Sequence, residues 1–142
     1  MEKHIGVTGT RFGMTEAQKA RLLEVLRLDD FTHWHHGKCV GVDVETHGLM
    51  VEWFPKIHIV IHPPQKTEHE GVALLREGDE IRERKSHFAR NRDIVDETGG
   101  LIVIPYQMEW QPKGGTWYTH DYAIKQKKPV VVIWPDGTRK LA

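Results

Sequence analysis

The chain has 142 residues, a length that favours one domain built around one ordinary hydrophobic core. Lys plus Arg and Asp plus Glu both number 20, so the formal charge is zero, which argues against a protein that coats DNA, RNA or an anionic membrane. The single cysteine, Cys39, allows no disulfide within the chain and favours a reducing compartment. The sequence shows neither an apolar run of membrane-spanning length nor a signal-peptide pattern. We therefore expect a cytoplasmic protein with no membrane partner.

Strands and helices are predicted to alternate along the chain. The apolar run HIGVTG (4–9) indicates a first strand, and Thr15 followed by Gln18 forms a capping box that starts a helix near Glu16. The other predicted elements are strands at 31–37, 56–64, 101–106 and 129–137, and helices at 41–54 and 116–128.

Residues 65–85 depart from this pattern because they are charged and show no clear period. The simpler interpretation is a solvated excursion. The alternative is a mobile lid that brings Arg82, Arg84 or Lys85 over a ligand, and the sequence leaves both open.

The order of elements predicts an α/β fold. Runs such as LIVI and VVVI are apolar throughout, as a parallel sheet covered on both faces requires. We expect a single Rossmann-like domain over residues 1–142, with a mostly parallel five-stranded sheet and helices on both faces. Ligands of such sheets bind at the carboxyl ends of the strands, where the strand order reverses.

Three glycine-containing loops are predicted at that edge: GTR (9–11), GKCVGVD (37–43) and KGGT (113–116). Glycines let the backbone approach a ligand, helix starts offer free N–H groups to an anion, and Arg11 offers a guanidinium suited to phosphate. The sequence has neither G-x-x-x-x-G-K-[ST] nor G-x-G-x-x-G, which excludes a P-loop NTPase and argues against a standard dinucleotide dehydrogenase. The loops therefore predict a different kind of phosphate site.

Other residues have two interpretations each. Arg90 and Asn91 either form a polar helix face or reach a phosphate or ribose. Trp110 and Trp117 either pack in the core or stack on a nucleobase. Cys39 is interpreted as a packing residue, since no partner base accompanies it.

Ten histidines raise the question of a metal. His33 and His35 share one strand face, but H-E-x-x-H and a cysteine pair are absent. We therefore expect no metal site and no cofactor.

Several segments together resemble the SLOG superfamily, a group that includes the Lonely-Guy nucleotide hydrolases and DNA-processing protein A. They are GTR after the first strand, HGKCVGVD after the second, HPP closing the third, ARNRDIVDETGGLIVIP, and KGGTWYTHDYAIKQKKPVVVIWPDG. The resemblance implies a Rossmann-like domain, often a homodimer or larger, that binds nucleotides or nucleotide-derived ligands. The ligand contacts it implies are Gly9, Thr10, Arg11, Gly37, Gly41, Asp43, Arg90, Asn91, Gly114, Gly115 and Thr116.

The sequence departs from the hydrolases of this family at one informative position. Lonely-Guy hydrolases carry P-G-G-x-G-T-x-x-E, whose glutamate acts in breaking the N-glycosidic bond, whereas Thr119 follows Thr116 here. A threonine cannot act as a carboxylate base. Asp43 and Asp121 are then the candidate catalytic carboxylates.

Two functions follow as hypotheses. The first is a protein that binds a nucleotide-derived molecule, such as an ADP-ribose-like signal, as a sensor or a sequestering sponge. The alternative is an enzyme, a nucleotide N-glycosidase (phosphoribohydrolase) or a related deoxyribosyltransferase. Nucleic-acid binding, by analogy with DNA-processing protein A, is disfavoured by the neutral charge and the lack of a basic stripe.

Overall fold

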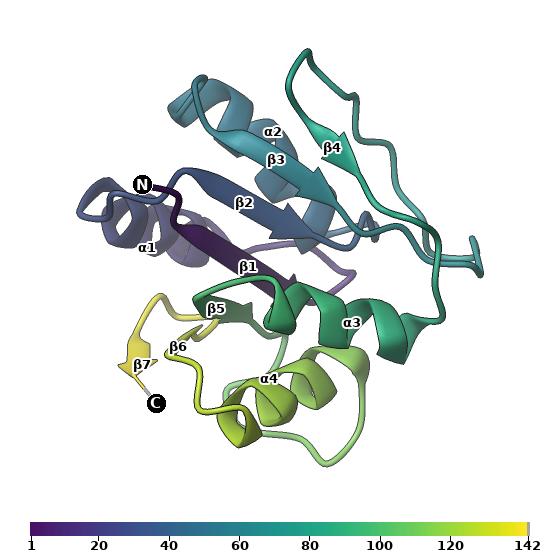
Figure 1. Ribbon diagram of the computed structural model, residues 1–142. Helices are drawn as coiled ribbons and strands as arrows, with labels where there is room; N and C mark the ends of the chain where they lie inside the picture. The colour runs from purple at the N-terminus through teal and green to yellow at the C-terminus, as the bar shows by residue number, and fades with distance from the viewer. Residues whose placement is uncertain (142) are drawn as a thin grey trace.

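A mostly parallel sheet of seven strands lies at the centre of the computed structural model, which describes residues 1–141 (Figure 1). The elements in chain order are β1 (His4–Gly9), α1 (Glu16–Arg27), β2 (His33–His36), α2 (Val42–Trp53), β3 (His58–Ile61), β4 (Glu80–Ile81), α3 (His87–Asp96), β5 (Gly100–Ile104), α4 (Gly115–Lys125), β6 (Val130–Ile133) and β7 (Arg139–Leu141). The predicted α/β class is confirmed.

The strand order is β4-β3-β2-β1-β5-β6-β7, and every neighbouring pair is parallel except β6 with β7. The chain runs outward from β1 to β4 on one side and then crosses to β5 on the other side of β1. The order therefore reverses between β1 and β5, which is where open α/β sheets place their ligands.

The prediction of five strands was wrong, because the sheet has two short strands more. β4 lies inside the charged segment and pairs through only Glu80 and Ile81, both exposed, while β7 is an exposed antiparallel strand at the opposite edge. Neither strand buries an apolar side, so neither leaves a hydrophobic period in the sequence.

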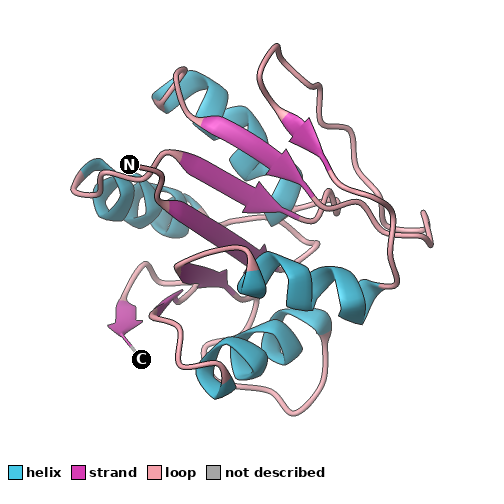
Figure 2. Cartoon of the chain, in the orientation of Figure 1, coloured by secondary structure: helices cyan, strands magenta, loops and turns pink. Residues whose placement is uncertain are grey.

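Helices cover both faces of the sheet, as Figure 2 shows. On one face, Leu22 of α1 and Met50 of α2 pack with Trp34 and Ile59 in the larger apolar cluster. On the other face, α3 and α4 pack with alternate residues of β5 and β6 in a second cluster that includes Ile94, Trp117, Val103 and Val132. Of the helices that the structure describes, none is long and apolar enough to cross a membrane.

The start of α1 confirms the predicted capping box. The Thr15 hydroxyl accepts from the Gln18 backbone N–H at 3.0 Å, and Gln18 Oε1 accepts from the Thr15 N–H at 2.9 Å. The buried Gln18 amide also donates to the carbonyls of Pro105 and Ile133, at 2.8 and 3.1 Å. One side chain thus ties α1 to the ends of β5 and β6.

The charged segment 65–85 is held to the domain by ion pairs. Arg82 pairs with Glu97 and Lys85 with Asp93, while Glu70 pairs with Lys38 outside the segment and with Arg84 inside it. Arg82, Arg84 and Lys85 are the three basic side chains that a lid would bring over a ligand, and none of them lines the cavity described next. The segment contributes His69 to that cavity instead.

Candidate ligand-binding site

A cavity of about 670 Å³ opens at the carboxyl ends of β1 and β2, between the starts of α3 and α4. It lies at the reversal of strand order, where the sequence predicts a site. Most of the predicted contact residues line it: Gly9, Thr10, Arg11, Asp43, Arg90, Asn91, Gly114, Gly115, Thr116 and Trp117.

Gly37 and Gly41, also predicted to contact the ligand, lie behind the cavity wall. The Gly37 carbonyl accepts a hydrogen bond from Arg90, and a Cβ at Gly37 would lie 2.7 Å from the Arg90 Cζ. Gly41 has a φ of 88° and packs directly against the backbone of Thr10. These two glycines therefore shape the wall and do not line the cavity.

Arg90 is the principal cation of the cavity. Its side chain is buried and its nitrogens bond to neutral groups: the carbonyls of Gly37 and His62, the Asn91 amide oxygen at 2.7 Å, His87 Nδ1 at 3.2 Å and Cys39 Sγ at 3.6 Å. Among residues 1–141, no carboxylate forms a salt bridge with it. A buried guanidinium without a contacting anion is costly, so it favours an anionic ligand in the space beside it.

Among the described residues, Asp43 is the one acidic residue that lines the cavity. Burial raises the pKa of its carboxyl from 3.8 to about 6, and this outweighs the opposing effects of the Arg90 charge and two backbone N–H donors. Those donors, from Gly37 and Cys39, lie 3.1 and 3.3 Å from the same oxygen, Oδ2. The carboxyl therefore titrates close to neutral pH. Burial also raises the pKa of the Cys39 thiol, which disfavours the reactive thiolate.

The N-terminus of α4 faces the same cavity. Gly114 precedes the helix with a φ of 103° and provides no side-chain cap. In the described chain, the backbone N–H groups of Gly115, Thr116 and Trp117 have no hydrogen-bond acceptor, and the first satisfied amide is that of Tyr118, which donates to the Gly114 carbonyl. Three free N–H groups at the positive end of a helix dipole form an anion-binding surface.

Thr119 does not reach this surface. It is fully buried, and its hydroxyl donates to the Gly115 carbonyl one turn earlier at 2.7 Å. Thr119, which on the sequence is compared with the glutamate of Lonely-Guy hydrolases, is thus a packing residue of α4.

The aromatic residues at the cavity differ from those expected. Trp117 lines the cavity but is only 3% exposed and packs on Trp134, with ring centroids 5.9 Å apart. Trp110 does not line the cavity; its Nε1 donates to Asp121 at 3.0 Å. The exposed rings at the cavity are those of Phe12, Phe88 and Tyr106.

Sequence reasoning placed Tyr106 in the loop after the fourth predicted strand without assigning it a ligand contact, and it missed Phe12, Phe88, His69 and His87. The His69 ring bonds to the guanidinium of Arg11, with 2.8 Å between His69 Nε2 and Nη1. Phe12 and Tyr106 lie in loops that follow predicted strands, so strand order places them at this edge, but no pattern shows which rings stay exposed. His69 lies in an irregular segment, and Phe88 and His87 lie at a helix start, where the sequence carries no periodic signal.

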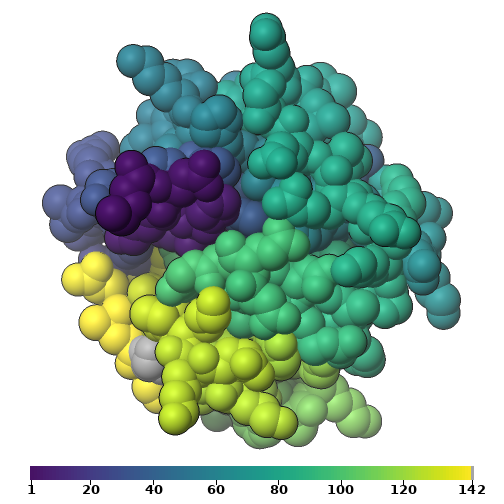
Figure 3. All heavy atoms as spheres, in the orientation of Figure 1, coloured from purple at the N-terminus to yellow at the C-terminus, as the bar shows by residue number. Residues whose placement is uncertain are grey.

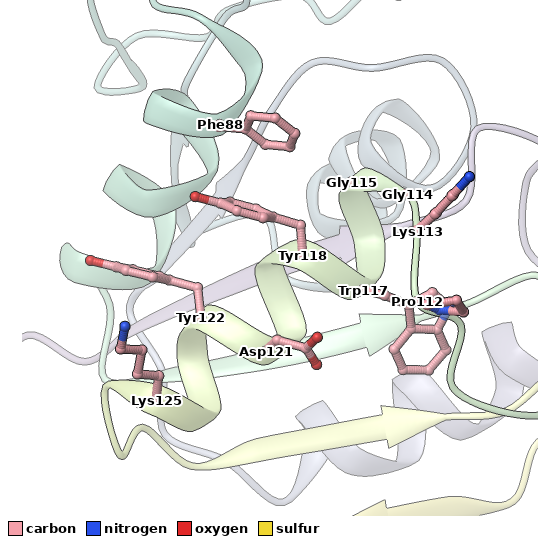
Figure 4. A pocket seen from close by; sticks show the side chains of 10 residues that line it. All are labelled: Phe88, Pro112, Lys113, Gly114, Gly115, Trp117, Tyr118, Asp121, Tyr122 and Lys125. Carbon is pink, nitrogen blue, oxygen red and sulfur yellow. The ribbon is translucent and has the colours of Figure 1, made fainter.

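A second cavity of about 570 Å³ adjoins the first along α4 (Figure 4). The two share the wall formed by Phe88, Lys113 and the glycine pair. The Phe88 ring, from α3, lies 4.3 Å from that of Tyr118 between centroids. Asp121 lines this second cavity and not the first, so the structure separates the two candidate carboxylates.

Neither a scan against models of known protein families nor searches of curated proteins and solved structures finds a match to this chain. The functional argument therefore depends on the geometry and on the residues themselves.

Proposed function

We propose that the protein binds a nucleotide or nucleotide-derived ligand, such as an ADP-ribose-like molecule, in the cavity at the carboxyl edge of the sheet. It acts as a sensor of that ligand or sequesters it. The observation that carries the proposal is the buried Arg90 guanidinium, which lines the cavity without a carboxylate partner in the described chain.

The parts of the cavity match the parts of such a ligand. Arg90 and the free amides at the start of α4 suit a phosphate, and Arg11 and Lys113 add positive charge at the same cavity. The Phe12 and Tyr106 rings, 5.1 Å apart between centroids and both exposed, offer apolar surface to a base. A volume of about 670 Å³ lies within the range of roughly 300–1,000 Å³ typical of small-molecule sites.

The strand order and the glycine loops also support a proposal of membership in the SLOG superfamily. Assembly into a homodimer or larger oligomer stays a prediction, which light scattering coupled to gel filtration tests directly.

The binding proposal is tested by calorimetry with AMP, ADP-ribose and cyclic ADP-ribose, using adenosine as the matched ligand without phosphate. We expect micromolar binding of at least one phosphate-bearing ligand and much weaker binding of adenosine. Equal affinity for AMP and adenosine, or no heat with any phosphate-bearing ligand, would contradict the proposal.

A second candidate function, N-glycosidic cleavage or transfer, is favoured by one observation. Asp43 combines a place in the cavity with a pKa of about 6, and a carboxyl that titrates near neutral pH suits acid–base work. Chromatography of AMP and NAD after incubation would reveal released base. If activity appears and both Asp43→Asn and Asp121→Asn retain it, the assignment to these carboxylates is wrong.

A further inference from the structure

Three histidines form a row across the amino-terminal end of the sheet. His4 of β1 lies opposite His33 of β2, and His33 lies opposite His58 of β3, in the parallel register of the strands. The rings stack: the centroids of His4 and His33 are 4.0 Å apart, and those of His33 and His58 are 5.0 Å apart. We call these three residues the histidine row.

Two of the three members of the histidine row reach the surface: His58 is exposed and His4 is partly exposed, whereas His33 is buried, with 8% of its surface exposed. His4 shares a face of β1 with Gly6, where an added Cβ would meet Ile94 of α3, so the row lies on the face that α3 and α4 cover further along. In Figure 1, none of the described helices passes in front of β2 and β3. Figure 3, from the same side, shows the N-terminal residues in purple at the surface. The side chain of His4 is 24% exposed and that of Glu2, beside it, is 71% exposed. A small ion in solution can therefore reach this end of the row.

Glu2, His4 and His33 bring three metal-ligating atoms together. One donor atom from each lies within 4.8 Å of the other two. A hydrogen bond of 2.9 Å already joins His4 Nε2 to Glu2 Oε1, which is the arrangement in which a metal ion can replace the shared proton. His33 Nδ1 is held by the Thr32 hydroxyl at 2.7 Å, which leaves Nε2 as the nitrogen available to a metal.

We propose that Glu2, His4 and His33 bind a divalent transition-metal ion of the zinc class. Two imidazoles and a carboxylate suit Zn²⁺, and three protein ligands leave a coordination position for water or an external ligand. This site is separate from the ligand cavity, which lies at the opposite end of the same strands.

Buried histidines behind His4 support the proposal. His4 Nδ1 lies 2.7 Å from His35 Nε2, and His35 Nδ1 lies 2.8 Å from His62 Nε2. When Nε2 of His4 binds the metal, its Nδ1–H donates to His35, which donates in turn to His62. Such hydrogen bonds to the second nitrogen fix the orientation and tautomer of a metal-binding histidine.

A second group of possible ligands, His35, His62 and Glu97, is the weaker candidate. The hydrogen bonds with His4 and His62 occupy both nitrogens of His35. The Arg82 guanidinium donates to Glu97 Oε1 at 2.9 Å, so a cation already occupies the carboxylate. We assign these histidines a supporting role.

The test is a titration of the metal-free protein with Zn²⁺ in competition with a chelating dye. We expect one Zn²⁺ per chain and a Zn²⁺ affinity at least about tenfold weaker for His4→Gln. Glu2→Gln, at an exposed position that leaves folding intact, should weaken the affinity in the same direction. The control is His58→Gln, which removes an exposed member of the row outside the proposed ligand set and should leave the affinity unchanged.

Two results would overturn the proposal. One is the absence of stoichiometric Zn²⁺ binding by the wild-type chain. The other is equal weakening by Glu2→Gln and His58→Gln, which would show that Zn²⁺ binds the histidine-rich surface without selecting these ligands. Co²⁺ substitution gives an independent reading, because two imidazoles and a carboxylate around Co²⁺ produce visible absorption bands that Glu2→Gln should alter.

Discussion

The two ends of the sheet are both rich in nitrogen, but they present it in opposite ways. At the carboxyl end, the cavity offers the guanidinium of Arg90 and backbone N–H groups of α4, all of which are donors suited to an anion. At the amino end, the histidine row offers imidazole lone pairs beside the Glu2 carboxylate, which suit a cation. The carboxyl end of the sheet therefore presents hydrogen-bond donors and positive charge, and the amino end presents lone pairs and a carboxylate.

The polarity of the parallel strands explains this difference. Each helix that follows a parallel strand directs its N-terminus to the carboxyl end of the sheet, so positive dipole ends gather there. The helix C-termini return to the amino end with partial negative charge, as α1 does before β2 and α3 does before β5. The backbone thus favours an anion at one end and a cation at the other before any side chain is added.

The largest expected effect comes from removing the buried cation. Arg90→Gln should weaken binding of a phosphate-bearing nucleotide by about 2–4 kcal/mol, at least about thirtyfold, because charge at a desolvated site is lost. Arg92→Gln is the matched control, since Arg92 lies on the same helix, is exposed and bonds to the Tyr118 hydroxyl at 2.8 Å. Isothermal calorimetry with both variants decides the matter, and equal losses in the two would remove Arg90 from its assigned role.

The next effect is a pH dependence of stability from Asp43. Its pKa is about 6 in the folded protein against an ordinary 3.8, so the folded state holds the proton more tightly than the unfolded state. As pH rises from about 4 to about 6, the folded protein should lose up to about 3 kcal/mol from this group and then level off. Asp43→Asn should not show this loss. Urea denaturation of both proteins from pH 4 to 8 measures the difference, and parallel curves would contradict the raised pKa.

A smaller effect should follow from filling the wall behind the cavity. Gly41→Ala should cost about 1–3 kcal/mol, because φ at this position is 88° and a Cβ would meet the backbone of Thr10 and Arg11. Gly48→Ala, in the exposed middle of α2 with nothing within 4 Å of the added Cβ, should instead stabilise the protein by up to about 1 kcal/mol. Thermal denaturation distinguishes the opposite signs.

The last prediction is that a substitution at one end of the sheet leaves ligand affinity at the other end unchanged, because the two sites are independent. Glu2→Gln should leave nucleotide affinity unchanged, and Arg90→Gln should leave Zn²⁺ affinity unchanged. Nucleotide titration of Glu2→Gln and Zn²⁺ titration of Arg90→Gln measure these two affinities. A change of more than about threefold in either would show that the ends are coupled through the sheet.

The sequence predicted the carboxyl end of the sheet better than the amino end, for a physical reason. The loops containing Gly9, Gly41 and Gly114 follow predicted strands directly, so strand order alone places them at one edge. The histidine row depends on the register between β1, β2 and β3, which pairs His4 with His33 and His33 with His58 and has no local signature. The expectation of no metal site rests on the absence of ligand motifs close in sequence, so it does not address ligands that strand register brings together.

Within the cavity, the limit of prediction lay in side-chain direction. Trp110 and Asp121 are near the glycine pair in the chain, but they bond to each other outside the main cavity. Arg90 was open to two interpretations because helical position alone does not show burial, and only the packed structure shows its charge facing the cavity.

The most direct test of the central claim is an NMR titration of the ¹⁵N-labelled protein with AMP. We expect the largest shifts at the amides of Gly115, Thr116 and Trp117 and at those of 9–11, with the amides of the histidine row unchanged. Shifts confined to the amino end of the sheet, or no shifts at millimolar AMP, would contradict the account.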